Sequence, residues 1–100
     1  MKIQDLALTL LPGLGSRSIA QLLDYFGTAT TLFARSRAEL AEAGLAEGLV
    51  SAITSKQTFA EAEDIVRRME REGVCGVAST DEEYPTLLRE CDDYPHVLYY

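Results

Sequence analysis

The stretch that decides the fold is Leu11-Pro12-Gly13-Leu14-Gly15-Ser16, which separates two segments with regularly spaced apolar residues. The first segment covers residues 3–11 and the second covers residues 16–26, and in both the apolar residues recur at helical spacing. Two glycines flanking one leucine predict a very short turn that few side chains would permit. The sequence therefore predicts a helix, a tight hairpin and a second helix over residues 3–26.

The start of the predicted second helix has a chemical consequence. Its free amide groups point outward beside a glycine, where no side chain shields them. Bare backbone donors at a helix N-terminus favour an anion, most often phosphate. The candidate binding residues are Gly13, Leu14, Gly15, Ser16 and Arg17, with Arg17 either adding a cation or simply facing solvent. The competing interpretation is a tight connector between packed helices, without a ligand.

Several further helices are predicted downstream. Gly27 fits a helix C-terminal cap, Thr28 fits the N-terminal cap of a short third helix, and Ser36 and Glu39 have the spacing of a capping box. Two longer helices follow, over residues 46–55 and 58–72. The short helices cannot be stable alone, so packing must hold them.

The period of the sequence changes after Gly73. Residues 74–79 are uncharged and partly β-branched, which predicts a buried strand. A short helix from Pro85 to Glu90, a turn over residues 92–95 and the opening of a strand over residues 97–100 complete the chain. The predicted fold class is mainly α: a helical bundle over residues 1–72, followed by a short β-α-β extension over residues 73–100.

Such an extension is too small to form its own core beside a helical bundle. We therefore expect the chain to be a fragment of a longer protein, cut near a domain entrance. We also expect residues 74–100 to lack a stable position within one copy. Three arrangements are open to them: packing on the bundle, exchange between chains, or mobility.

The distribution of charged residues limits the classes of function that the chain can have. The formal net charge is −7, and residues 1–57 are balanced, whereas residues 58–100 carry four basic and eleven acidic side chains. Phosphate neutralisation supplies most of the affinity of nucleic-acid binders, which show a basic face. This distribution argues against strong autonomous DNA binding.

The sequence predicts a cytoplasmic protein. No stretch approaches membrane-spanning length, and Asp5 and Pro12 interrupt the only run that resembles a signal peptide. Cys75 and Cys91 are too few for a disulfide framework, so we expect reduced thiols that behave as small buried apolar residues.

No catalytic or metal site is evident in the sequence. His96 is the only histidine, and without partners in the sequence neither a metal site nor a catalytic triad is supported. We expect it to be a polar turn residue. No base accompanies Ser16 or Ser18, and the Gly-Leu-Gly run lacks the third glycine of a dinucleotide site. We expect a non-enzymatic protein with no cofactor, no metal and no small-molecule substrate.

Two motifs together resemble a known family. The stretch from Leu8 through residues 11–15 to the pair Leu22-Leu23 resembles the helix-hairpin-helix of DNA repair and recombination proteins. The run Asp81-Glu82-Glu83-Tyr84-Pro85-Thr86-Leu87-Leu88, followed by Pro95-His96-Val97-Leu98-Tyr99-Tyr100, resembles the DNA-processing protein A family, DprA, also called Smf. Both motifs occur in the order and spacing of that family, over essentially the whole chain.

The resemblance implies a fold and a function. DprA proteins act in natural transformation, where they bind incoming single-stranded DNA and load the recombinase RecA onto it. The family has an N-terminal helical domain, similar to a sterile-alpha-motif (SAM) fold, before a Rossmann-like domain that binds the DNA and mediates dimerisation. Residues 1–72 would then be the SAM-like domain with the helix-hairpin-helix at residues 3–26. Residues 73–100 would be the entry to a truncated Rossmann-like domain.

This sequence departs from the helix-hairpin-helix pattern in two ways. Ile19 stands where such motifs often carry a small alanine, and Arg17 is the only cation near the turn. Three hypotheses therefore stay open: an accessory domain of a DprA-like single-stranded DNA binder, a protein-interaction module without DNA contact, and an enzyme fragment from another nucleic-acid processing protein.

Overall fold

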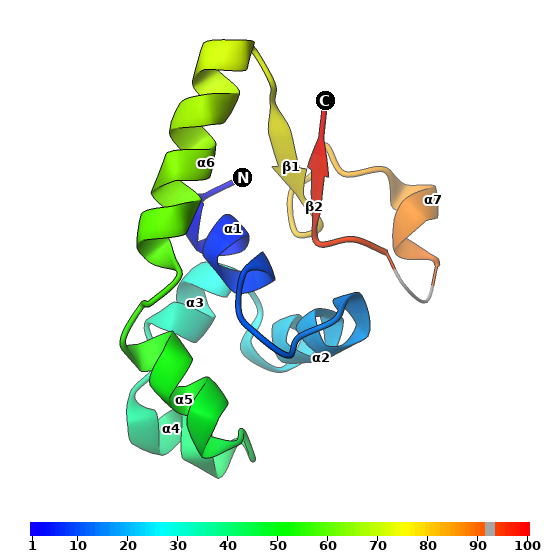
Figure 1. The fold of residues 1–100 in the computed structure, drawn as a ribbon. Coiled ribbons are helices and arrows are strands. Elements are labelled where there is room, and N and C mark those ends of the chain that lie inside the picture. The colour runs from blue at the N-terminus through cyan, green and yellow to red at the C-terminus, as the bar shows by residue number, and fades with distance from the viewer. Residues whose placement is uncertain (92–93) are drawn as a thin grey trace.

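The computed structural model describes residues 1–91 and 94–100, and it confirms the mainly helical fold class (Figure 1). The helices are α1 (Ile3–Thr9), α2 (Ser16–Phe26), α3 (Ala29–Phe33), α4 (Arg37–Glu42), α5 (Glu47–Thr54), α6 (Phe59–Glu72) and α7 (Thr86–Arg89). The strands are β1 (Gly76–Ala78) and β2 (Val97–Tyr99). Within the described residues, no helix combines the length and the apolar character needed to cross a bilayer.

Local capping determines several helix ends, as the sequence predicts. The Ser36 hydroxyl accepts a hydrogen bond from the Glu39 amide, and the Glu39 carboxylate accepts one from the Ser36 amide, which completes the capping box of α4. Thr28 caps α3 by accepting from the amide of Thr31. Helix α6 ends at Gly73, whose φ of +69° is the left-handed conformation of a helix C-cap.

The centre of the fold is α1, the helix that precedes the hairpin. Leu6, Ala7 and Leu8 are completely buried on three successive positions, so α1 is enclosed on several sides and not along one stripe. It contacts α3, α6 and β2, and lies beside the lower part of the long α6 in Figure 1. The Thr58 hydroxyl, just before α6, donates to the Ala7 carbonyl at 2.8 Å. This buried bond joins α6 to α1 across fifty-one positions of sequence.

The extension packs on the bundle. Strands β1 and β2 pair antiparallel, with Val77 opposite Leu98 and Ala78 opposite Val97. Strand β2 lies beside α1, and Val97 belongs to the same core cluster as the helices. The expectation that residues 74–100 lack a stable position within one copy is therefore wrong for residues 74–91 and 94–100, which pack on the bundle.

Element boundaries in the extension differ slightly from the prediction. Strand β1 is shorter than the expected range 74–79, and α7 begins at Thr86 because Pro85, with φ −59° and ψ 122°, occupies the N-cap position and not the first helical one. The turn expected over residues 92–95 begins with Asp92 and Asp93, which lie outside the described residues.

The link between α1 and α6 gives the first prediction. Thr58→Val keeps the side-chain shape but removes the hydroxyl that donates to the Ala7 carbonyl, and leaves that buried acceptor with one bond fewer. We expect the free energy of unfolding to fall by about 1–2 kcal/mol, measured by urea denaturation. Thr30→Val, at an exposed position of α3, is the matched control and should change stability little. Equal losses in both variants would contradict the assigned role of the Thr58 hydroxyl.

Candidate functional site

The connection between α1 and α2 is the hairpin that the sequence predicts, and its backbone depends on Gly13. This residue has φ of +81°, which residues with a Cβ rarely adopt. Gly15 has φ −93° and ψ 176°, an ordinary extended conformation, and a Cβ placed there would meet no atom within 4 Å. The turn therefore requires glycine at position 13 and not at position 15, so the prediction of a turn that few side chains would permit holds for Gly13 alone.

Gly15 has a different consequence for the start of α2. It stands at the N-cap position and has no side chain to accept from the amides of the first turn, which also contains no acidic residue. Gly13, Gly15 and Arg17 are exposed, while Leu14 and Ser16 are half-buried. Within the described part of the chain Arg17 forms no ion pair. The five candidate residues thus lie together, on the end of the connection and the uncapped first turn of α2.

The start of α2 lies beside the C-terminal extension. An open hollow of about 300 Å³ separates the two. The hairpin side contributes Gly15, Ser16 and Ile19, and the extension contributes Pro95, His96, Val97 and Tyr99. The two motifs that carry the family resemblance therefore meet in space, although some eighty residues separate them in the sequence.

A chain of three buried polar side chains lies behind this hollow. Asp5 Oδ1 is 2.8 Å from His96 Nε2, and His96 Nδ1 is 2.7 Å from Ser79 Oγ. The exposed fractions of Asp5, His96 and Ser79 are 6 %, 4 % and 6 %. The other carboxylate oxygen of Asp5 accepts a hydrogen bond from the Lys2 amide at 2.9 Å. Each buried polar side chain thus has a partner, as burial of such groups requires.

The bonding pattern follows from the chemistry of the three groups. An ionised carboxylate only accepts hydrogen bonds, so His96 Nε2 donates to Asp5. In a neutral ring Nδ1 then accepts from the Ser79 hydroxyl, and in a charged ring it donates to the same oxygen. Because a hydroxyl both donates and accepts, Ser79 satisfies either protonation state of His96.

The same residue types form catalytic triads, but this arrangement differs from one. In the serine protease triad the nucleophile bonds to Nε2 and the carboxylate to Nδ1, whereas here the two nitrogens are exchanged. The Ser79 residue is buried, so a substrate carbonyl cannot reach its oxygen without displacement of the extension. We interpret the three residues as a structural network that joins β1 and β2 to α1.

This network corrects the expected role of His96. The sequence suggests a polar turn histidine without partners, because Asp5 and Ser79 lie ninety-one and seventeen positions away. One signal in the sequence is Asp5 itself, an acidic residue directly before the apolar run Leu6-Ala7-Leu8. A buried carboxylate needs a partner, and His96 is the only histidine in the chain.

The motif residues Asp81 and Tyr84 also have structural contacts. Tyr84 is 1 % exposed and its hydroxyl donates to the Pro95 carbonyl, while burial raises its pKa above 10.0. The Arg89 guanidinium lies over the Tyr84 ring and donates from Nε to the Ser79 carbonyl at 2.7 Å. These contacts close the loop around α7.

Asp81 is a second charged anchor of the extension. Its carboxylate accepts a hydrogen bond from the Ala78 amide at 2.8 Å and pairs with the Met1 ammonium at 2.8 Å. Burial alone would raise the pKa of Asp81, but these two hydrogen bonds and the nearby positive charge lower it below its ordinary value of 3.8.

Among the residues that the structure describes, the remaining reactive side chains do not gather into a site. Cys75 and Cys91 are both free and exposed, in contrast to the expected burial. Cys75 pairs through its backbone with Tyr100 at the end of the short sheet, and this edge position leaves its thiol in solvent. Over residues 1–91 and 94–100, no three side chains of His, Cys, Asp or Glu lie together as metal ligands would.

Comparisons of the chain with protein-family models, with curated proteins and with solved structures found no match.

The buried network gives the second prediction. His96→Leu leaves the Asp5 carboxylate buried without its ring partner, so we expect the free energy of unfolding to fall by about 3 kcal/mol. In the double variant Asp5→Asn/His96→Leu, the loss should be at least about 1 kcal/mol smaller than the sum of the single losses, because the two side chains interact. Chemical denaturation of all four proteins measures this coupling. Strictly additive losses would contradict a direct Asp5–His96 interaction.

The lowered pKa of Asp81 gives the third prediction. Because folding lowers this pKa, the carboxylate stabilises the fold above its ordinary pKa, and the contribution disappears as pH falls below about 4. Asp81→Asn should lower the free energy of unfolding by about 1 kcal/mol at neutral pH. In this variant the free energy of unfolding should also fall less steeply as the pH is lowered into the acid range, which we call the acid limb. Glu83→Gln, at an exposed position of the same loop, is the matched control. An unchanged acid limb in Asp81→Asn would contradict the role given to this carboxylate.

Proposed function

We propose that this chain is the N-terminal accessory part of a DNA-processing protein of the DprA/Smf type, and that it is not itself an enzyme. In this proposal its hairpin makes a weak, sequence-independent contact with a nucleic-acid backbone. The observation that carries the proposal is the exposed start of α2, where uncapped amides lie beside Arg17 and the first turn has no acidic residue.

The chemistry of this connection suits one phosphate group. Backbone amides and a guanidinium are both donors, and phosphate oxygens are strong acceptors. A contact of this kind positions a backbone and reads no bases. Tyr99, which is half exposed and lines the same hollow, offers an aromatic face on which an unpaired base could stack.

The wider fold assignment belongs to the same proposal. Residues 1–72 would be the SAM-like helical domain, and residues 73–100 would open the Rossmann-like domain. The antiparallel pair of β1 and β2 fits a Rossmann-like sheet at its edge, because mixed sheets of this class carry antiparallel strands there. The motif residues Tyr84 and Asp81 support the assignment as framework positions that hold this edge against the helices.

The whole protein would supply the partners. We propose that it is a cytoplasmic homodimer that binds single-stranded DNA chiefly through its Rossmann-like domain and loads RecA in natural transformation. The present residues would contribute little affinity of their own, since their net charge of −7 repels a polyanion.

A second candidate is a protein-interaction module without DNA contact. Two observations favour it: the acidic net charge and an open apolar groove between α2 and the connection of α4 with α5. Under this interpretation the hairpin is a connector that fixes the angle between α1 and α2.

The hairpin contact gives the fourth prediction. Fluorescence anisotropy with a labelled oligothymidine should show weak binding at low salt, falling with a log–log salt slope of about −0.7 for a single phosphate contact. Arg17→Glu should lower the affinity about tenfold, because it replaces the cation beside the amides with a repelling carboxylate. Arg68→Glu changes the net charge equally at an exposed position of α6 and should have a smaller effect.

Two results would reject parts of the proposal. Absence of binding at low salt, or equal effects of the two charge reversals, would favour the interaction module over the hairpin contact. Cleavage of the labelled strand after addition of Mg²⁺ would contradict the non-enzymatic assignment.

A further inference from the structure

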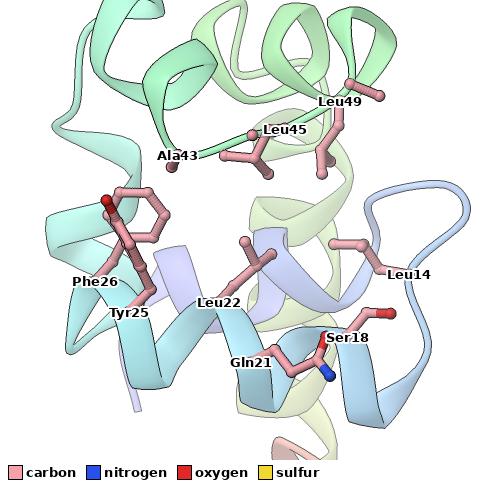
Figure 2. A pocket seen from close by; sticks show the side chains of 11 residues that line it. Leu14, Ser18, Gln21, Leu22, Tyr25, Phe26, Ala43, Leu45 and Leu49 are labelled. Carbon is pink, nitrogen blue, oxygen red and sulfur yellow. The ribbon is translucent and has the colours of Figure 1, made fainter.

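An open apolar groove runs along the side of α2. Figure 2 shows Leu22, Tyr25 and Phe26 of α2 on one side, and Leu45 and Leu49 of the α4–α5 region on the other. The groove has a volume of about 360 Å³. Leu22 and Leu45 point toward each other across the gap in this view.

The side chains of the groove are only partly removed from water. Leu22, Phe26, Leu45 and Leu49 are half-buried, and Tyr25 is 70 % exposed. Half-buried leucines and an exposed tyrosine still gain free energy when a partner covers them, at about 25 cal/mol for each square ångström of apolar surface. Contiguous apolar surface of this kind marks interaction sites on soluble proteins.

One end of the groove carries negative charge. A second hollow continues from Tyr25 and Phe26 and is lined by Arg35, Glu39 and Glu42. Arg35 is hydrogen-bonded to Glu39, so the charges of these two compensate. Glu42 is exposed, and within the described residues it forms no ion pair. One uncompensated carboxylate, that of Glu42, therefore lies near the exposed ring of Tyr25.

The opposite end of the groove is formed by Leu14 and Ser18, which carry no charge. The groove thus has one acidic end, which gives an occupant a preferred direction.

We propose that this groove binds an amphipathic helix of a partner protein, with an apolar face on the leucines and a lysine or arginine against Tyr25 and Glu42. An aromatic face and a carboxylate together are a favourable environment for such a cation. The net charge of −7 also favours encounter with a basic partner. The proposal specifies the partner class for the interaction-module function and rests on that function, but not on the DNA contact.

The dimensions suit a short helical segment. From Ser18 to Phe26 the axis of α2 rises by about 12 Å, at 1.5 Å per residue. A helix lying along it contacts the groove over about two turns, which gives two or three apolar anchors at i, i+3 or i+4, and i+7.

The test uses synthetic helical peptides and the whole 100-residue chain. One stapled peptide of about twelve residues carries leucines at i, i+4 and i+7 and arginines at one end, and its twin carries glutamates in place of the arginines. Calorimetric titration measures affinity, and methyl NMR shifts locate the contact. We expect saturable binding of the basic peptide, with shifts at Leu22, Leu45 and Leu49, and weaker binding of the acidic twin.

Three variants make the test specific. Tyr25→Ala should lower the affinity for the basic peptide about fivefold. Glu42→Lys should lower that affinity by a similar factor and raise the affinity for the acidic twin, since exposed ion pairs contribute up to about 1 kcal/mol. Both positions are exposed, so the fold should survive. Glu63→Lys on α6 makes the same charge change outside the groove and should leave both affinities unchanged.

Other outcomes would overturn the proposal. No saturable binding, equal binding of the two peptides, or equal effects of Glu42→Lys and Glu63→Lys would each reject a basic helical partner. Self-association in sedimentation that Tyr25→Ala abolishes would assign the groove to a second copy of this chain. Because Tyr25→Ala leaves Arg17 in place, DNA anisotropy on the same variant separates failure of this proposal from failure of the hairpin contact.

Discussion

The contact between Asp5 and His96 determines how the two parts of this chain fit together. It joins α1, the most enclosed helix, to the segment that leads into β2. Two buried groups of this kind are tolerated only when each finds its partner, because an unpaired carboxylate in the interior costs several kcal/mol. The extension therefore has a defined position on the bundle that apolar packing of a three-residue strand alone would specify poorly.

Ser79 and Asp81 extend this constraint to β1. Ser79 completes the chain of polar contacts from the opposite strand, and Asp81 ties the loop after β1 to Met1, at the start of the helical part. As a result the hairpin, the first helix and the two strands form one structural unit. The hollow beside the start of α2 depends on this unit, because residues 95–97 form its second wall.

Local features of the sequence were sufficient to predict much of the helical architecture. The capping pair Ser36 and Glu39 and the stop at Gly73 depend on residues a few positions apart, so the sequence contains all the required information. The hairpin prediction is confirmed at Gly13, where the turn needs a positive φ. Gly15 shows the limit of the pattern, since glycine there leaves amides uncapped but is not required by the backbone.

Long-range polar contacts could not be predicted in this way. Helical spacing indicates which residues share a face of a helix. It does not indicate that Asp5 bonds to a histidine near the other end of the chain. Tyr84 stands out in the sequence as part of a local motif. Its hydrogen bond to the Pro95 carbonyl could not be predicted, because that bond depends on how α7 folds back. The groove along α2 is a similar case, because its far wall comes from a connection twenty residues downstream.

The two proposed contacts use separate surfaces of helix α2. A phosphate would approach along the helix axis, at the amides of its first turn, whereas a partner helix would lie against its side at Leu22 and Tyr25. Ile19 and Leu23 meanwhile bury the third face of α2 in the core. The acidic end of the groove lies at the far end of α2 from Arg17, so a basic partner helix would not compete with DNA for the same charge. One short helix therefore supports the fold through one face, and the two proposals assign its N-terminus and its side to different ligands.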